Sequence, residues 1–267
     1  MMIRSIMNVK GGIGKTTTAI QLAAGLGKAG RKTLIVDADG QGTCTLLLLP
    51  DKDFNSDEDY AGKTLGGTLL GTYPIEECIW GTDIPNVDII PSNLDLFNTI
   101  YELQSNSING LPQFKLKQLL RSLDYDEIVI DNNPSINMMS VNSIYAADEL
   151  IIPTCPDVGG LAGVQMTLNH AAMVIKDIDR DARIDYHILF TLVNRNNLER
   201  QTISKFREIY GDHIFRQPIR YQANPVKHAN FSNTLLIDDM QANVSADYRC
   251  LINEVLEKNI EQAGDEE

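Results

Sequence analysis

The chain has 267 residues, of which 43% are hydrophobic and 22% are charged, and its formal net charge is −13 at pH 7. This composition is typical of one large α/β core, so we expect a single domain over 1–267. Because we find no signal peptide and no apolar run near the ~18 residues of a membrane span, we expect a cytoplasmic protein without a membrane partner. The four cysteines lie far apart with no C-x-x-C pair, which excludes a disulfide framework and a cysteine zinc site.

The first predicted elements are a short buried strand over 3–9 and a helix over 16–28. Apolar residues of the helix, such as Ile20 and Leu26, fall mostly on one face. Gly30 is placed to end the helix in a left-handed conformation. The segment between them therefore joins the end of a strand to the start of a helix.

That segment reads K-G-G-I-G-K-T-T over 10–17, a deviant form of the phosphate-binding motif G-x-x-x-x-G-K-[ST] with the extra lysine Lys10. Three glycines let backbone N–H groups converge on phosphate oxygens at the helix start: Gly11, Gly12 and Gly14. Lys15 is expected to reach the β- and γ-phosphates, and the Thr16 hydroxyl to ligate Mg²⁺. A chance glycine turn with an unpaired surface lysine is the alternative, and the order of strand, loop and helix disfavours it.

Strand-like apolar runs alternate with helical stretches along the rest of the chain. They cover Thr33–Asp37, Val87–Ile90, Glu127–Asp131, Glu149–Pro153 and Tyr186–Asn194. The alternation predicts an α/β fold with a doubly wound, mostly parallel sheet flanked by helices, as in P-loop NTPases. The acidic stretch Asp51–Gly62 is expected to be a solvated loop.

Two acidic segments follow predicted strands, at the edge where open α/β sheets bind ligands. In V-D-A-D-G-Q-G over 36–42, Asp39 lies in a glycine-flanked turn and is a candidate to polarise an attacking water. In V-I-D-N-N-P-S over 129–135, Asp131 closes a hydrophobic strand and fits an aspartate that binds Mg²⁺ through water. Each aspartate alone would more often be a cap or turn residue, but three segments in this order favour a nucleotide site.

These motifs, with I-I-P-T at 151–154 and L-V-N-R at 192–195, resemble the deviant Walker A ATPases typified by the ParA and Soj partition proteins, with MinD and the nitrogenase iron protein as relatives. The resemblance implies ATP and Mg²⁺ as cofactors and a homodimer in which each Lys10 contacts the partner's nucleotide. Such a lysine would neutralise transition-state charge across the interface. The remaining implied roles are Lys15 and Asp39 in catalysis, Asp39 and Asp131 near magnesium, Thr17 near the α-phosphate and Asn194 near the adenine.

Three positions depart from the family pattern. Gly40 replaces the usual proline, Thr43 replaces an asparagine, and Asn133-Pro134 replaces a pair of prolines. Gly40 is expected to loosen its turn, because glycine has more backbone freedom to lose than proline. We expect these changes to affect the rate of hydrolysis rather than the binding of nucleotide.

Basic residues gather in 195–227, although the sequence pI is about 4.7. Seven basic residues and three acids give this segment a net charge of +4. Because the whole chain carries −13, the rest of the chain carries −17. Such polarisation suits a local phosphate-binding patch, and the alternative is a solvated helix face with scattered loop arginines. The candidate contacts are Arg195, Arg200, Arg216 and Arg220. The resemblance implies non-specific DNA as the ligand, a nucleoid-associated location and a centromere-binding partner of the ParB type.

A helix-turn-helix domain is not expected, because nine residues precede Lys10. The last segment, 246–267, is predicted to be an amphipathic helix with an acidic tail. Its seven acids against two basic residues would repel anionic lipid, so packing against the domain is expected rather than a MinD-like membrane contact. Its apolar residues at helical spacing are Tyr248, Leu251, Ile252, Val255, Leu256 and Ile260.

The sequence thus predicts a ParA-like partition ATPase. Two alternatives stay open: a positioning ATPase whose cargo is a protein assembly, and a small-molecule P-loop kinase or amidoligase-like enzyme. Lys10 has no evident use in the second alternative.

Overall fold

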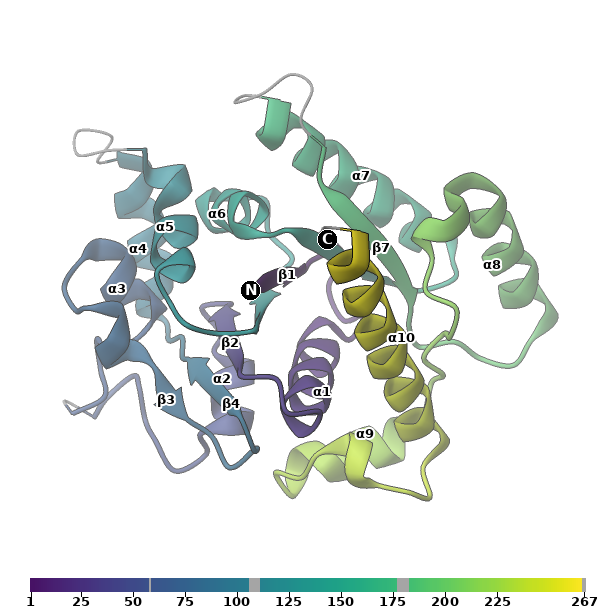
Figure 1. Cartoon of the computed structure of the whole chain (residues 1–267), viewed down its shortest axis with the longest axis horizontal. Helices are drawn as coiled ribbons and strands as arrows, with labels where there is room; N and C mark the ends of the chain where they lie inside the picture. The colour runs from purple at the N-terminus through teal and green to yellow at the C-terminus, as the bar shows by residue number, and fades with distance from the viewer. Residues whose placement is uncertain (58, 106–110, 177–182, 266–267) are drawn as a thin grey trace.

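A computed structural model describes residues 1–57, 59–105, 111–176 and 183–265. Seven strands form one sheet in the order β3-β4-β2-β5-β1-β6-β7, and every neighbouring pair is parallel except β3 with β4 (Figure 1). The strands are β1 (Met2–Ile6), β2 (Thr33–Ala38), β3 (Trp80–Gly81), β4 (Val87–Ile90), β5 (Glu127–Asn132), β6 (Glu149–Thr154) and β7 (Asp185–Phe190). The predicted doubly wound, mostly parallel sheet is confirmed.

Helices cover both faces of this sheet. Their bounds are α1 (Lys15–Lys28), α2 (Thr43–Leu48), α3 (Leu65–Leu70), α4 (Asp95–Ser105), α5 (Lys115–Arg121), α6 (Met138–Ala146), α7 (Val158–Lys176), α8 (Asn197–Tyr210), α9 (Ala223–Phe231) and α10 (Asn243–Asp265). In Figure 1, α3 to α6 lie together on one side, whereas α1 and α10 lie side by side on the other. The molecule therefore has three layers.

Strand residues alternate between the two faces, as the period of a β-strand requires. Ile35 and Val129 pack with α1 and α10, whereas their neighbours Leu34 and Ile128 pack with the helices of the opposite face. Because central strands are buried on both faces, they read as continuous apolar runs. That is why their positions were predictable from the sequence.

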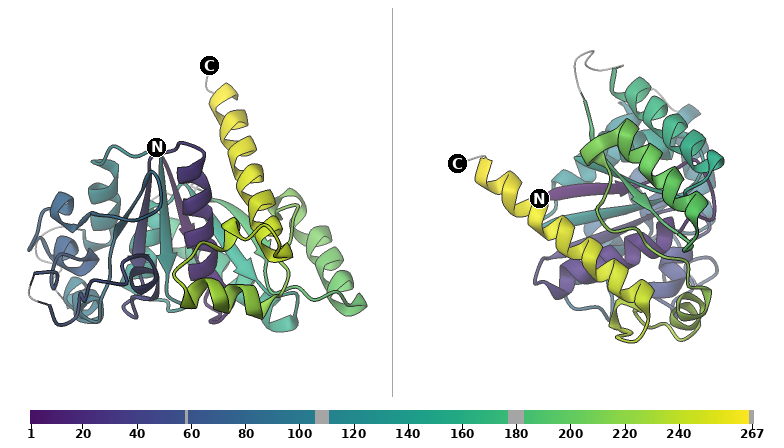
Figure 2. Two further views of the ribbon diagram at one scale, coloured as in Figure 1. Left: turned by 90° about the horizontal axis from the view of Figure 1, so that it is seen from below. Right: turned by 90° about the vertical axis from the view of Figure 1, so that its right-hand side faces the viewer.

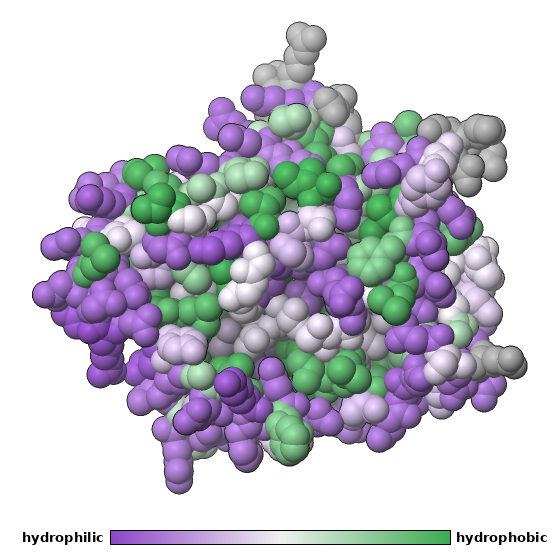
Figure 3. All heavy atoms as spheres, turned by 180° about the vertical axis from the view of Figure 1, so that it is seen from behind, coloured by the Kyte–Doolittle hydropathy of each residue, from purple (hydrophilic) through white to green (hydrophobic). Residues whose placement is uncertain are grey.

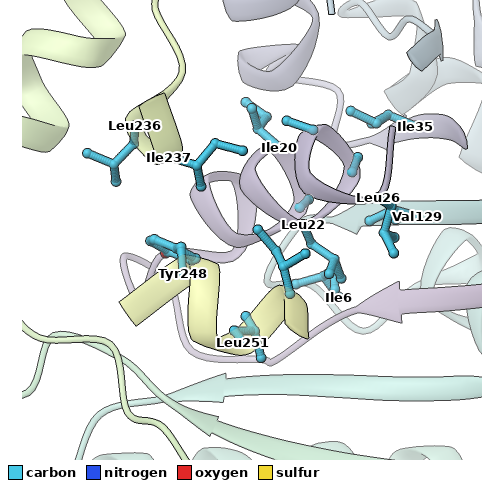
Figure 4. Close-up of a cluster of buried hydrophobic side chains, with 14 of the residues drawn as sticks. Ile6, Ile20, Leu22, Leu26, Ile35, Val129, Leu236, Ile237, Tyr248 and Leu251 are labelled. Atoms are coloured by element: carbon cyan, nitrogen blue, oxygen red, sulfur yellow. The ribbon is translucent and has the colours of Figure 1, made fainter. Parts of the chain in front are cut away.

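The C-terminal helix α10 packs against the domain, as predicted, and the structure shows that it does so on α1. Figure 4 shows Tyr248 and Leu251 of α10 in one buried cluster with Leu22 of α1. A methyl group on Gly25 of α1 would overlap the Ile252 side chain, so the two helices meet closely at this glycine. The predicted apolar stripe is wrong at its end, because Ile260 is 74% exposed where α10 projects beyond the sheet (Figure 2).

Three local predictions differ from the structure. The last strand ends at Phe190 rather than at residue 194, because Leu192 adopts a left-handed backbone with φ of 56°. The edge strand β3 was not predicted, since two residues are too few to show a pattern. Asp51–Gly62 forms turns where it is described, but Phe54 is buried against Trp80 rather than solvated.

The helix α7 corrects the expectation on membrane spans. Within the described residues it is long and apolar enough to cross a membrane by length and composition, with a mean hydropathy of 1.2. One such helix is weak evidence for a membrane span. Only 33% of α7 is buried, but its Val164, Ala171 and Val174 side chains lie in a buried cluster with β6 and β7. On the face opposite to that of Figure 1, hydrophobic side chains are interspersed with hydrophilic ones (Figure 3).

Candidate nucleotide site

The loop between β1 and α1 has the backbone that the motif requires. Gly12 and Gly14 adopt left-handed conformations with φ of 70° and 82°, which favour glycine over residues with a Cβ. Between them, Ile13 is 1% exposed, and the Thr191 hydroxyl donates a hydrogen bond of 2.8 Å to its carbonyl oxygen. The apolar anchor and this hydrogen bond fix the loop at the start of α1, where N–H groups point at an anion.

The two lysines of the loop have different environments. Lys15 is 7% exposed, and its Nζ donates to the Lys10 carbonyl oxygen at 3.1 Å. Burial lowers the pKa of Lys15, and the carboxylates of Asp131 and Asp39 oppose that shift. A buried ammonium beside an anion-binding loop is ready to bind phosphate, since the phosphate would replace an uncharged carbonyl as its acceptor.

Lys10 makes an ion pair with Asp157, which sequence reasoning missed. Its Nζ lies 2.9 Å and 3.0 Å from the two Asp157 carboxylate oxygens. Asp157 precedes α7 and also accepts a hydrogen bond from the backbone N–H of Gly160. Burial alone would raise the pKa of Asp157, but the hydrogen bonds from Lys10 and Gly160 lower it. The signature lysine is therefore held within its own chain.

Asp131 and Asp37 face each other at the ends of β5 and β2, where they are paired in register. Both are buried, and burial raises the pKa of Asp131 well above its usual range and that of Asp37 to about 6. Asp37, another missed residue, accepts hydrogen bonds from the Thr45 N–H at 2.8 Å and the Thr45 hydroxyl at 2.7 Å. Its only sequence signal was its place in the V-D-A-D segment, beside the candidate Asp39.

The environment of the Asp131 carboxylate indicates whether Mg²⁺ would fit beside the phosphate loop. Both of its carboxylate oxygens are buried and have no hydrogen-bond partner among the described residues. The Thr16 hydroxyl is near enough to lower the pKa of this carboxyl, though not to make a regular hydrogen bond. An orphaned carboxylate costs free energy when buried, and a hard cation with oxygen ligands would compensate it. Thr16 and Asp131 therefore fit Mg²⁺.

Asp39 lies in the turn after β2, within electrostatic reach of Lys15. Its N–H donates to Asp37 Oδ1 at 3.2 Å, and its own Oδ1 accepts the Gln41 N–H at 3.0 Å. The neighbouring Gly40 explains one departure from the family pattern, because a Cβ there would lie 2.7 Å from the Phe97 ring of α4. Phe97 thus fills the space that a larger residue at position 40 would need.

A cavity of about 220 Å³ opens beside the start of α1. It is lined by Gly14 and Thr17 and by apolar atoms of Leu192, Ile219 and Val226, among others. This is suitable for a nucleoside, because such pockets are mostly apolar with a few polar groups. The predicted adenine contact Asn194 does not line the cavity, and its N–H and side-chain amide donate to the Glu199 carboxylate instead.

The four candidate DNA contacts fall into two groups. Arg195 and Arg200 are exposed at and near the start of α8, and neither has an ion-pair partner in the described part of the chain. Arg216, by contrast, pairs with Glu254 and Glu257 of α10. Arg220 donates through Nε and Nη2 to the buried Asp247, each at 2.6 Å, and lines the cavity beside the start of α1. Their positive charge is partly neutralised within the chain.

Comparisons with known proteins agree with this geometry. A family model described as an AAA domain matches residues 1–184. The chain is 32% identical to the chromosome-partitioning ATPase Soj of Treponema pallidum over 78% of this chain and 79% of that protein. It is 28% identical to the sporulation initiation inhibitor protein Soj of Bacillus subtilis over 95% and 97% of the two chains. A putative plasmid partition protein from Borrelia burgdorferi, solved with AMPPNP, has the same fold with a TM-score of 0.78 and 24% identity over 96% of this chain and 99% of that one.

Proposed function

Because the chain belongs to the ParA/Soj family of P-loop partition ATPases, we propose that it hydrolyses ATP to ADP and phosphate in a Mg²⁺-dependent cycle that segregates DNA. The observation that carries the proposal is the left-handed glycine loop, with buried Lys15 at its helix start and the orphaned Asp131 carboxylate beside it. Together they supply phosphate ligands and a metal ligand in one place.

Each residue has a distinct role in the proposed reaction. The loop N–H groups and Lys15 bind the β- and γ-phosphates, and Thr17, which lines the cavity beside α1, binds the α-phosphate. Thr16 and Asp131 hold Mg²⁺, which when bound neutralises phosphate charge. Asp39 orients the attacking water and, with its N–H held by Asp37, is positioned on the turn after β2.

Lys10 is the residue from which we infer the oligomeric state of the protein. Its Nζ is held by Asp157, whose side chain is 56% exposed, so the ion pair lies at the surface rather than inside the phosphate loop. An exposed ion pair contributes only about 0–1 kcal/mol, and a partner's phosphates can compete for the lysine. We infer an ATP-dependent homodimer in which Lys10 of each subunit reaches the nucleotide of the other.

The unpaired Arg195 and Arg200 support non-specific DNA as the ligand of that dimer. Lys205 and Arg207 on the same helix α8 are also exposed and extend the basic surface. We propose release of DNA upon hydrolysis stimulated by a ParB-type partner, and a cytoplasmic, nucleoid-associated protein. Arg216 and Arg220 contribute less, because α10 carboxylates already bind them.

Sedimentation velocity with ADP or a non-hydrolysable ATP analogue, with and without DNA, tests the function. The wild-type protein is expected to dimerise and to bind DNA in the presence of the ATP analogue but not in the presence of ADP. Lys15→Ala should lose roughly ten- to hundredfold in nucleotide affinity, because it removes a charge-assisted contact of about 1.5–3 kcal/mol. Lys10→Ala should bind ATP but remain monomeric, whereas Asp39→Ala should form a dimer that does not turn over.

The outcomes also separate the alternatives. A dimer that binds no DNA at low salt would favour a positioning ATPase with protein cargo. Normal ATP-dependent dimerisation by Lys10→Ala would contradict the cross-subunit role of this lysine. Unchanged nucleotide affinity in Lys15→Ala would overturn the phosphate-site assignment itself.

A further inference from the structure

A second group of chemistry-bearing side chains lies at the opposite end of the sheet from the phosphate loop. Asp185 and His187 are two residues apart on the edge strand β7, and His213 ends the short helix η4 (Gly211–His213) that follows α8. One possible ligand atom from each of the three lies within 4.8 Å of the others. Asp185 pairs with Glu149 at the start of β6, whereas the phosphate loop follows the end of β1. The proposed ATPase cycle does not use this group.

Both imidazoles already have a partner at Nδ1. His187 Nδ1 lies 2.6 Å from Glu149 Oε1, and His213 Nδ1 lies 3.0 Å from the Tyr186 carbonyl oxygen. The other Glu149 oxygen accepts a 2.7 Å hydrogen bond from Arg4 Nε, which fixes the carboxylate. Histidines that bind metals typically donate their second ring N–H to a carboxylate or a backbone carbonyl. Nε2 of each ring is therefore the nitrogen available to a metal ion.

Ring contacts hold both histidines in place without a ligand. The His213 ring stacks on Tyr186 with centroids 4.3 Å apart, and the His187 and His213 centroids are 6.0 Å apart. His187 is mostly buried, whereas Asp185 and His213 are exposed and accessible to an ion. The nearby cation Lys258 has its Nζ 4.9 Å from the centroid of the Phe215 ring. Burial lowers the pKa of Lys258, and the carboxylates of Glu149, Glu254 and Asp185 oppose that shift.

We propose that Asp185, His187 and His213 bind a first-row transition-metal dication, with Zn²⁺ the best chemical match. Two imidazole nitrogens and one carboxylate oxygen suit Zn²⁺, whereas Mg²⁺ and Ca²⁺ prefer oxygen ligands alone. The ligand atoms now lie within 4.8 Å of one another, so the exposed Asp185 carboxylate and His213 ring would move when the ion binds, to zinc–ligand distances of about 2.0–2.2 Å. Water completes the tetrahedron. The metal links β7 to η4 and so fastens the end of α8 to the sheet edge.

Calorimetric titration of the tag-free, chelator-stripped full chain with ZnCl₂ in excess MgCl₂ tests this site. We expect one high-affinity ion per chain, and a tetrahedral absorption band with Co²⁺. His213→Ala and Asp185→Asn should each weaken binding by at least about tenfold. His228→Ala and Asp212→Asn are the matched controls, since they remove an exposed histidine and an exposed η4 carboxylate outside the group.

Three results would overturn the proposal. The first is the absence of stoichiometric Zn²⁺ binding by the wild type. The second is equal affinity of His213→Ala and His228→Ala. The third is loss of binding in Cys250→Ser with retention in His213→Ala, which would assign the ion to the exposed thiol of Cys250. Because His213 and Asp185 are exposed, their variants are expected to keep the far-ultraviolet circular dichroism of the wild type, and that spectrum is the check on folding.

Discussion

At the scale of single residues, the site is organised by pairs of unlike exposure. The Lys15 side chain is buried and largely removed from water, whereas Lys10 makes an ion pair with Asp157 at the surface. Asp131 is buried and has no hydrogen-bond partner in the described part of the chain, whereas Asp37 beside it accepts several hydrogen bonds. The less satisfied member is the candidate metal ligand, and the better satisfied one positions the turn that carries Asp39.

Asp157→Asn is expected to favour the ATP-dependent dimer. The substitution removes the charge that holds Lys10, but asparagine still caps the start of α7. Since an exposed pair contributes about 0–1 kcal/mol and two such pairs are broken in each dimer, the dimer dissociation constant should fall by up to about thirtyfold. Sedimentation with a non-hydrolysable analogue measures this, and Asp126→Asn, at an exposed position outside the loop, is the control. A weaker dimer would mean that Asp157 acts at the interface itself.

Asp37 should make stability depend on pH. Burial raises its pKa from 3.8 to about 6, so between these values the folded protein binds more protons than the unfolded chain. Its contribution to the free energy of unfolding therefore falls as the pH rises through this range, by at most about 1.4 kcal/mol per pH unit. Urea unfolding of wild type and Asp37→Asn at pH 4.5, 5.5 and 6.5, with EDTA and no nucleotide, isolates the effect as a difference. The opposite sign would contradict the burial argument.

At the scale of elements, the phosphate loop depends on helices that the motif does not contain. α1 carries the loop's C-terminal end and packs on α10, with η5 (Leu236–Asp238) beside both (Figure 4). Gln21 of α1 accepts the Ile237 N–H at 2.9 Å, which joins the last third of the chain to the nucleotide helix. The orientation of α1 is therefore set by residues more than 200 positions away.

Gly25→Ala should destabilise the protein although alanine is the better helix former. Helix propensity favours alanine by about 1 kcal/mol, but overpacking against Ile252 costs typically 1–3 kcal/mol. We expect a net loss of up to about 2 kcal/mol in the free energy of unfolding. Chemical denaturation of the single variants and of Gly25→Ala with Ile252→Ala measures the coupling. The double variant should be more stable than additivity predicts by at least about 0.5 kcal/mol, and strict additivity would rule out the contact as the cause.

At the scale of the whole molecule, charge is unevenly distributed. The chain as a whole has a formal net charge of −13, but the segment 195–227 has a net charge of +4. α10 neutralises part of that segment through Asp247, Glu254 and Glu257. The unpaired basic side chains on and before α8 are what remains to attract a polyanion, while the acidic remainder repels it.

The salt dependence of DNA binding should report this patch. Each lost duplex phosphate contact lowers the magnitude of the slope of log K against log salt by about 0.9, so Arg195→Ala with Arg200→Ala should reduce that magnitude by up to about 1.8. ATP-dependent dimerisation should survive, because neither residue belongs to the phosphate loop. Lys117→Ala with Lys176→Ala removes the same charge from exposed positions on α5 and α7 and should leave the slope nearly unchanged. An undiminished slope in the arginine variant would place the DNA surface elsewhere.

The sequence by itself determined the features that depend on contiguous residues. The loop at 10–17 needs local backbone angles that its glycines allow. The central strands are recognisable in the sequence as continuous apolar runs, because both of their faces are buried. Asp39 was identifiable because it follows such a strand, and Asp131 because it lies at the end of one. In the same way, the apolar spacing of the last helix predicted its packing.

Only the tertiary structure decided which side chains meet. Lys10 forms an ion pair with Asp157, Gly40 lies against Phe97, and Asp247 neutralises Arg220. Separate crossover connections bring the members of each pair together. No local pattern encodes such pairs, since they depend on the path of the chain between them rather than on backbone preference. A short antiparallel strand such as β3 is likewise fixed by its neighbour β4, not by its own two residues.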